Sequence, residues 1–200
     1  MNVPPHRDYA GAKLGMWIFL FTELLLFGGL FLLYAVNLAR YPQEFTAAGG
    51  EMHLVLGTLN TAILITGSFF AAMAVTAIQR DERRRTVWLL GGAVLSAAVF
   101  LFNKYLEWSA EIGHGIYPDS PRLVAGPPGE SVFFSLYYLT VGLHGLHVLI
   151  GGTFLTVVAV RVRRGSIHAG NYVLLENGAL YWHLVDLVWI FIFPLYYLIL

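Results

Sequence analysis

The sequence has 200 residues, of which 58% are hydrophobic and 12% are charged, and its acidic and basic residues give a formal net charge of zero. Its mean hydropathy of +0.67 lies outside the range of soluble globular domains, and its charge balance indicates no nucleic-acid partner. The absence of cysteine excludes a disulfide framework and a thiolate metal site. We therefore expect a polytopic membrane protein.

The first long apolar run predicts a membrane-spanning helix over about 14–38, bounded by Lys13 and Arg40. The run is too long for a signal-peptide core and has no evident cleavage site, so we expect it to be retained. Glu23 lies roughly 13 Å inside this helix, close to the bilayer midplane. A carboxylate is costly there, so we expect Glu23 to be largely protonated beside a partner group or a water chain. A structural carboxyl and a proton-handling role both fit this placement.

Four more apolar runs follow, and each is long enough to cross a membrane as a helix. The second span is rich in small and hydroxyl-bearing residues that favour close helix packing, and Asn60 within it is a candidate structural polar residue. The segment 109–130 contains too many prolines and glycines for a sixth span. The sequence thus predicts an all-α bundle of five transmembrane helices that forms one domain over residues 1–200. The later spans are expected at about 53–78, 86–108, 131–160 and 174–200.

Basic residues gather on one side of the predicted membrane. The opposite side has only Arg40 and Arg122. By the positive-inside rule the N-terminus is therefore cytoplasmic and the C-terminus periplasmic, as an odd number of spans requires. The basic side collects Arg7, Lys13, Arg80, Arg83, Arg84, Arg85, Arg161, Arg163 and Arg164.

Two of the inner spans carry paired polar residues. Lys104 and Glu107 are three residues apart on the third span, so an ion pair within that helix is the expected structural role. His144 and His147 lie one turn apart on one face of the fourth span, where a structural role is again expected.

The last span carries three ionisable residues in an otherwise apolar segment. Glu176, His183 and Asp186 fall at positions i, i+7 and i+10, which places them on one stripe at helical pitch. A charged stripe of this kind must face protein or water and not lipid. We therefore expect it to form a polar seam inside the bundle or against a partner.

Histidines in a membrane bundle also raise the hypothesis of a bis-histidine haem. Such a site needs imidazoles from two facing positions, which His144 or His147 opposite His183 could supply. His144 and His147 are too close on one helix to bind opposite faces of one haem. No cluster of histidines and carboxylates has the ligand spacing of a zinc or di-iron site. A b-type haem protein therefore stays a distant alternative, and we expect no metal site.

Five motifs, one in each span, carry a resemblance to a known family. They are GMW at 15–17 with Glu23 and Phe27, LNT at 59–61 with Gly67 and Ser68, KYLEW at 104–108, LHGLHVLIGG at 143–152 and ENGALYWHLVDLVW at 176–189. Their order and spacing closely resemble subunit III of the haem-copper oxidases, the cytochrome c oxidase family. The common form of that subunit has seven helices, and this five-span sequence resembles bacterial members in which the first span matches the family's third.

The resemblance implies roles for several residues. Glu23 matches the family's intramembrane glutamate, and Glu176, His183 and Asp186 match polar positions of its last helix. The family's subunit III carries no redox cofactor, since the haems and copper belong to partner subunits. It holds phospholipids in a cleft beside its first two helices, which this sequence lacks, so bound phospholipid is an open expectation here.

The resemblance also implies a function. The expected protein is a non-catalytic subunit of a proton-pumping terminal oxidase that passes electrons from cytochrome c to oxygen in a bacterial plasma membrane. It would stabilise the catalytic subunit I and support its proton uptake, beside subunit II and either a small subunit IV or a respiratory supercomplex. Alternatives are an accessory subunit of nitric oxide reductase and subunit III of a quinol oxidase. A small proton-linked transporter is weaker, because only Pro194 interrupts a span.

Overall fold

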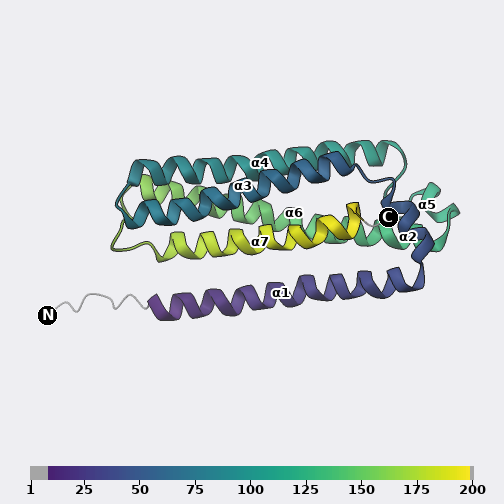
Figure 1. Cartoon of the computed structure of the whole chain (residues 1–200), viewed down its shortest axis with the longest axis horizontal. Helices are drawn as coiled ribbons and strands as arrows, with labels where there is room; N and C mark the ends of the chain where they lie inside the picture. Colours follow the sequence, from purple (N-terminus) through teal and green to yellow (C-terminus); the bar gives the residue numbers. More distant parts are fainter. Residues whose placement is uncertain (1–8, 199–200) are drawn as a thin grey trace.

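The computed structural model describes residues 9–198, and each of its long helices runs antiparallel to the long helix before it in the chain (Figure 1). Five of the helices are long and apolar enough to cross a membrane. The prediction of an all-α bundle with five transmembrane helices is therefore confirmed. The five are α1 (Tyr9–Arg40), α3 (Leu54–Gln79), α4 (Arg83–Gly113), α6 (Pro128–Arg163) and α7 (Val173–Tyr197).

Two short helices lie in segments that the sequence treated as loops, α2 (Pro42–Gly49) and α5 (Pro121–Ala125). Both carry proline in the first turn, where its missing N–H costs nothing. The Ser120 hydroxyl caps α5 by accepting a hydrogen bond from the Leu123 amide at 3.2 Å. Helices of eight and five residues are too short to show an apolar period, which is why the sequence pattern missed them.

The ends of the spans differ from the sequence prediction by several residues. The helix α4 continues past the predicted end at 108 to Gly113, and α7 ends at Tyr197. Residues 199–200 of the predicted last span and Arg7 of the basic side lie outside the described residues. After α6 the chain turns at Gly165, whose φ of +82° is a conformation that glycine adopts without steric cost.

The helix α1 lies at the edge of the bundle, alongside α6 and α7 (Figure 1). In an apolar stretch of 18 residues within α1, only 11% of the residues are buried, whereas 50% are buried in the corresponding stretch of α7. It docks through one narrow stripe, because Leu20, Phe27 and Tyr34 are its buried residues and recur every seven positions. Most of its remaining surface is apolar and exposed, as expected for a helix that meets lipid or a partner.

The turn between α3 and α4 and the turn between α6 and α7 meet at the end of the bundle where α1 begins (Figure 1). At this end Tyr9 donates a hydrogen bond to the Gly170 carbonyl at 3.0 Å, and the Arg83 guanidinium donates to the Val162 carbonyl at 2.6 Å. The described basic residues of the predicted cytoplasmic side are therefore gathered at one end. We call it the arginine end. The orientation of this end across the membrane stays a prediction.

Candidate functional site

Glu23 of α1 meets His147 of α6 inside the membrane-spanning part of the bundle. The Glu23 Oε2 atom lies 2.9 Å from His147 Nε2, and the two side chains are 13% and 11% exposed. The Phe27 ring packs edge-on against the imidazole, with ring centroids 5.2 Å apart. The expected partner group of Glu23 is therefore a histidine, and the contact fixes the depth at which α1 sits against α6.

The hydrogen bonds of His147 determine where a proton must lie. The Nδ1 atom is 2.7 Å from the Leu143 carbonyl oxygen, which can only accept, so Nδ1 carries a hydrogen. In the neutral ring Nε2 is then a bare acceptor, and a carboxylate facing it would present lone pair to lone pair. Either Glu23 is a carboxylic acid that donates to Nε2, or the imidazole is protonated and donates to the carboxylate. In both states one proton lies between Glu23 and His147.

The three ionisable residues of α7 contact different helices. Glu176 accepts a hydrogen bond from Lys13 of α1 at 2.9 Å. This ion pair lies near the arginine end, and both side chains are partly exposed. His183 Nδ1 lies 2.5 Å from the Ser68 hydroxyl of α3, and Ser68 is also a polar neighbour of Asp186. The stripe predicted from the sequence is therefore divided between two neighbours, because α7 lies between α1 and α3.

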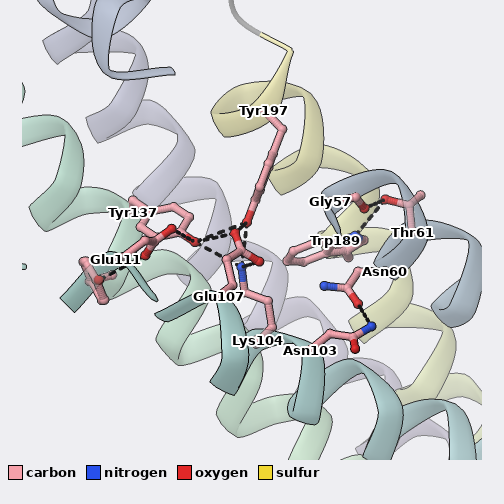
Figure 2. A network of polar contacts seen from close by, with 11 residues as sticks. Gly57, Asn60, Thr61, Asn103, Lys104, Glu107, Glu111, Tyr137, Trp189 and Tyr197 are labelled. Atoms are coloured by element: carbon pink, nitrogen blue, oxygen red, sulfur yellow. Dashed lines mark hydrogen bonds and ion pairs between the residues drawn. The ribbon is translucent and has the colours of Figure 1, made fainter. Parts of the chain in front are cut away.

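A second polar group, which we call the Lys104 cluster, lies toward the opposite end of the bundle. Lys104 donates its three N–H bonds to Glu107 at 2.9 Å, to Tyr137 at 3.1 Å and to Tyr197 at 2.6 Å. Figure 2 shows the Tyr137 and Tyr197 side chains pointing toward Lys104 and Glu107. The ion pair expected within α4 is present, and side chains from α6 and α7 complete it. The cluster comprises Lys104, Glu107, Glu111, Tyr137, Tyr138 and Tyr197.

The Lys104 cluster is buried and contains one more carboxyl than the ammonium can balance. The Lys104 and Glu107 side chains are 7% and 0% exposed, so water does not screen them. The Tyr138 hydroxyl has one hydrogen but two acceptor neighbours, Glu111 Oε2 at 3.0 Å and the Ile116 carbonyl at 2.8 Å. A proton on Glu111 would supply the missing hydrogen and would leave the cluster neutral.

Two further hydrogen bonds between helices lie beside the Lys104 cluster (Figure 2). Asn103 donates to the Asn60 side-chain oxygen at 2.9 Å, and the Trp189 indole donates to the Thr61 hydroxyl at 3.0 Å. These bonds join α3 to α4 and to α7. Asn60 is completely buried, so it links helices and does not face lipid.

His144 is completely buried, and neither ring nitrogen has a hydrogen-bond partner among residues 9–198. The imidazole packs between the Phe100 ring, edge-on at 5.5 Å, and the Trp189 ring at 5.2 Å. We expect His144→Phe to raise the free energy of unfolding by about 1–3 kcal/mol, because the substitution removes buried polar atoms that lack partners. Denaturant unfolding in mild detergent measures the change.

The matched comparison for His144→Phe is His147→Phe, which should lower stability because it leaves Glu23 without a partner. A loss of stability in His144→Phe would show that the imidazole is bonded to a buried water and is not an idle packing group.

The histidines considered for a haem have separate surroundings. His147 faces Glu23, His183 faces Ser68, and His144 packs against aromatic rings. The structure therefore does not bring His144 or His147 together with His183 as a facing pair of ligands. Within residues 9–198 no group of three histidines and carboxylates is close enough to hold a metal ion.

Sequence reasoning missed the partners that neighbouring helices contribute. The Lys104 cluster depends on three tyrosines, and Glu176 depends on Lys13, which the sequence indicated only as the start of a span and as one of the basic residues on the predicted cytoplasmic side. One available signal was the presence of Tyr137 and Tyr138 inside an apolar run, because a buried tyrosine hydroxyl needs a partner.

The fold and these contacts define a class of protein, namely a multi-pass helical membrane protein in which most of the ionisable residues inside the bundle have polar partners. The family model described as cytochrome c oxidase subunit III matches residues 6–199. This chain therefore belongs to the cytochrome c oxidase subunit III family, as its five motifs indicated.

Individual relatives agree with this membership. Cytochrome c oxidase subunit 3 of Thermostichus vulcanus is 33% identical over 198 residues, covering 97% of this chain and 89% of that protein. Heme-copper oxidase subunit I+III of Aeropyrum pernix is 32% identical over 191 residues, covering 92% of this chain and 22% of that protein. A probable quinol oxidase subunit 3 of Staphylococcus epidermidis is 28% identical over 202 residues, covering 99% of this chain and 94% of that protein.

Proposed function

We propose that this chain is the non-redox subunit III of a proton-pumping haem-copper oxidase that passes electrons from cytochrome c to oxygen in a bacterial plasma membrane. Residues 1–200 form its single domain. The chain stabilises the catalytic subunit and supports proton uptake into it, while the haems and copper reside in partner subunits. Family membership and the similarity to cytochrome c oxidase subunit 3 support this assignment.

The observation that carries the proton-support role is the Glu23–His147 contact. A proton lies between two groups that exchange it without rearrangement, since Nδ1 of His147 is already committed to the Leu143 carbonyl. The pair is placed within the membrane, where an ionisable residue is costly and is retained chiefly for function. Such a pair can hold a proton near the surface of a neighbouring subunit and release it during turnover.

The proposed partners follow from the relatives and from the exposed surface. The Aeropyrum pernix relative combines subunits I and III in one chain, which supports packing of this chain against subunit I. Subunit II, a small subunit IV or supercomplex, and cytochrome c follow from the family resemblance alone. The proposed orientation places the arginine end in the cytoplasm, on the side from which protons are taken up.

The test is Glu23→Gln in the assembled oxidase. Glutamine keeps the shape and can still donate to His147 Nε2, so the helix contact is preserved while the exchangeable proton is lost. We expect the rate of proton uptake during turnover to fall severalfold and inactivation to occur after fewer turnovers. Stopped-flow pH-indicator measurements on proteoliposomes follow the uptake.

Two further variants control this experiment. Glu23→Asp keeps a carboxyl group and should give an intermediate rate. Glu44→Gln changes a carboxyl on α2, outside the five spans, and should have no effect. If the Glu23→Gln complex assembles fully and takes up protons at the wild-type rate, the proton-support role is wrong, whereas the family membership is unaffected.

A quinol oxidase is the second candidate, favoured by the Staphylococcus epidermidis relative that matches 99% of this chain. The electron donor is bound by other subunits, so the two candidates assign the same role to this chain. Oxygen consumption by the purified complex with reduced cytochrome c or with a quinol distinguishes them.

A further inference from the structure

Helices α4 and α6 form a groove that holds two hollows along its length. The first lies at the arginine end, has a volume of about 390 Å³ and is lined by Arg83, Arg84, Val87, Trp88 and Arg163. We call it the head pocket. The second lies deeper in the membrane, has a volume of about 200 Å³ and is lined by apolar and small residues of the same two helices, including Val94, Ala98, Gly152 and Thr156. We call it the inner pocket.

The helical register connects the two hollows. Residues 84, 87, 91, 94 and 98 of α4 recur at spacings of three or four, so they follow one face of that helix. Gly91 lies midway, and a Cβ atom built on it meets nothing within 4 Å. On α6 the spacing from Arg163 to Thr156 is seven residues, or about 10 Å. The groove therefore passes from the head pocket to the inner pocket without a side chain at Gly91 to interrupt it.

The head pocket is positively charged. Arg83 is fixed by its hydrogen bond to the Val162 carbonyl at 2.6 Å. Arg84 and Arg163 are exposed and have no acidic partner within the described part of the chain. The nearby acids are Asp81 and Glu82, and Glu82 is paired with Arg85 at 3.0 Å. Two guanidinium groups are thus available to an anion, and guanidinium groups bind phosphate well.

The residues that line the groove change from charged to apolar with depth, in the same order as the headgroup and acyl chain of a phospholipid. Arginines lie outermost, Trp88 follows one turn further along α4 and is 73% exposed, and only apolar and small residues line the inner pocket. Tryptophan is typical of the level where headgroups meet hydrocarbon. Val94 lies about 15 Å along the helix from Arg84, which is half the thickness of a hydrocarbon core. The groove is therefore long enough for a chain that reaches the bilayer midplane.

We infer that the α4–α6 groove binds one anionic phospholipid, with its phosphate on Arg84 and Arg163 and one acyl chain over Gly91 into the inner pocket. The occupant is a membrane lipid because charge complementarity at the head pocket and an apolar hollow deeper along the same helix face occur together. This site is distinct from the Glu23–His147 pair, and it depends on the membrane-spanning fold and not on the redox partner. Bound lipid would fill the space between α4 and α6 that side chains leave open.

The test uses the oxidase complex purified in mild detergent and native mass spectrometry of the released chain. Phosphatidylglycerol and phosphatidylcholine are offered at equal concentration, and we expect one retained phosphatidylglycerol. Each arginine near a membrane surface contributes about fivefold to the affinity for anionic lipid, so Arg84→Gln with Arg163→Gln should weaken binding about 25-fold. Arg164→Gln removes the same charge beside the pocket and should change little.

The acyl chain is tested separately. Ala98→Phe places a ring in the inner pocket and should reduce lipid retention severalfold, whereas Ala72→Phe on the exposed side of α3 should not. Equal retention in Ala98→Phe would overturn the chain placement. Displacement of the lipid by excess inorganic phosphate would show a simple anion site, and absence of any phosphatidylglycerol on the wild-type chain would refute the proposal. Each of these readouts is independent of proton uptake.

Discussion

Glu107→Leu is expected to lower the free energy of unfolding by about 3–5 kcal/mol, the usual cost of leaving a buried charge without its partner. Glu107 is fully buried and accepts hydrogen bonds from Lys104 at 2.9 Å and from Tyr197 at 2.6 Å. Its loss leaves the ammonium group with only hydroxyl groups as direct hydrogen-bond partners, and the second carboxyl of the cluster, Glu111, contacts it only through the Tyr137 hydroxyl. Denaturant unfolding of the purified chain in mild detergent, monitored by tryptophan fluorescence, measures the effect.

The double variant Lys104→Met with Glu107→Leu is the control for this prediction. It removes both charges and replaces them with apolar side chains of similar length, so most of the lost stability should return. If the single substitution lowers the free energy of unfolding no more than the double one does, the ammonium group is solvated or neutral. The Lys104 cluster would then not contain a buried ion pair. Tyr197→Phe should have a smaller effect, since one neutral hydroxyl contributes about 1 kcal/mol.

The sequence was sufficient to predict the five membrane-spanning helices, because a helix that crosses a membrane needs a long apolar run and such runs are continuous in the chain. It also placed Lys104 beside Glu107, since a separation of three residues on one helix fixes their distance. Local spacing therefore predicted the contacts that lie within a single helix. The positions of α2 and α5 were not predicted, because five to eight residues show no period.

Contacts between helices could not be predicted from spacing. Glu23 and His147 are separated by 124 positions in the chain, and nothing in either motif indicates that α1 packs with α6 at that level. The same limitation applies to Glu176, which contacts Lys13 on α1, while His183 contacts Ser68 on α3. A stripe on one helix identifies polar side chains, but the rotation of that helix among its neighbours decides which contact each one makes.

Burial of His144 without hydrogen bonds was also beyond sequence reasoning. A lone imidazole in a bundle is expected to be hydrogen-bonded, yet Phe100 and Trp189 surround this one. The aromatic neighbours come from α4 and α7, so only the assembled bundle reveals them. The helix packing that produces this environment depends in turn on small residues at close crossings.

One of these crossings is tested by Gly67→Ala, which should lower the free energy of unfolding by about 1–3 kcal/mol. Gly67 is buried where α3 packs on α4, and a Cβ atom built on it lies 2.9 Å from Ser96 Cβ. Real Cβ atoms do not approach so closely, and Ser96 Cβ is fixed by the backbone of α4. One helix must therefore move away from the other, which loosens their shared contact surface. Unfolding in mild detergent measures the loss.

Gly28→Ala on α1 makes the same change where a Cβ atom meets nothing within 4 Å, so the opposite result is expected. Alanine is a better helix former than glycine by about 1 kcal/mol, and no neighbour opposes it there. The two variants should thus shift stability in opposite directions. Placing Gly67→Ala in a Ser96→Gly background should remove much of its cost, because the opposing atoms are gone. An equal cost in both backgrounds would show that the strain arises elsewhere, and the close approach of α3 to α4 would not explain the requirement for glycine.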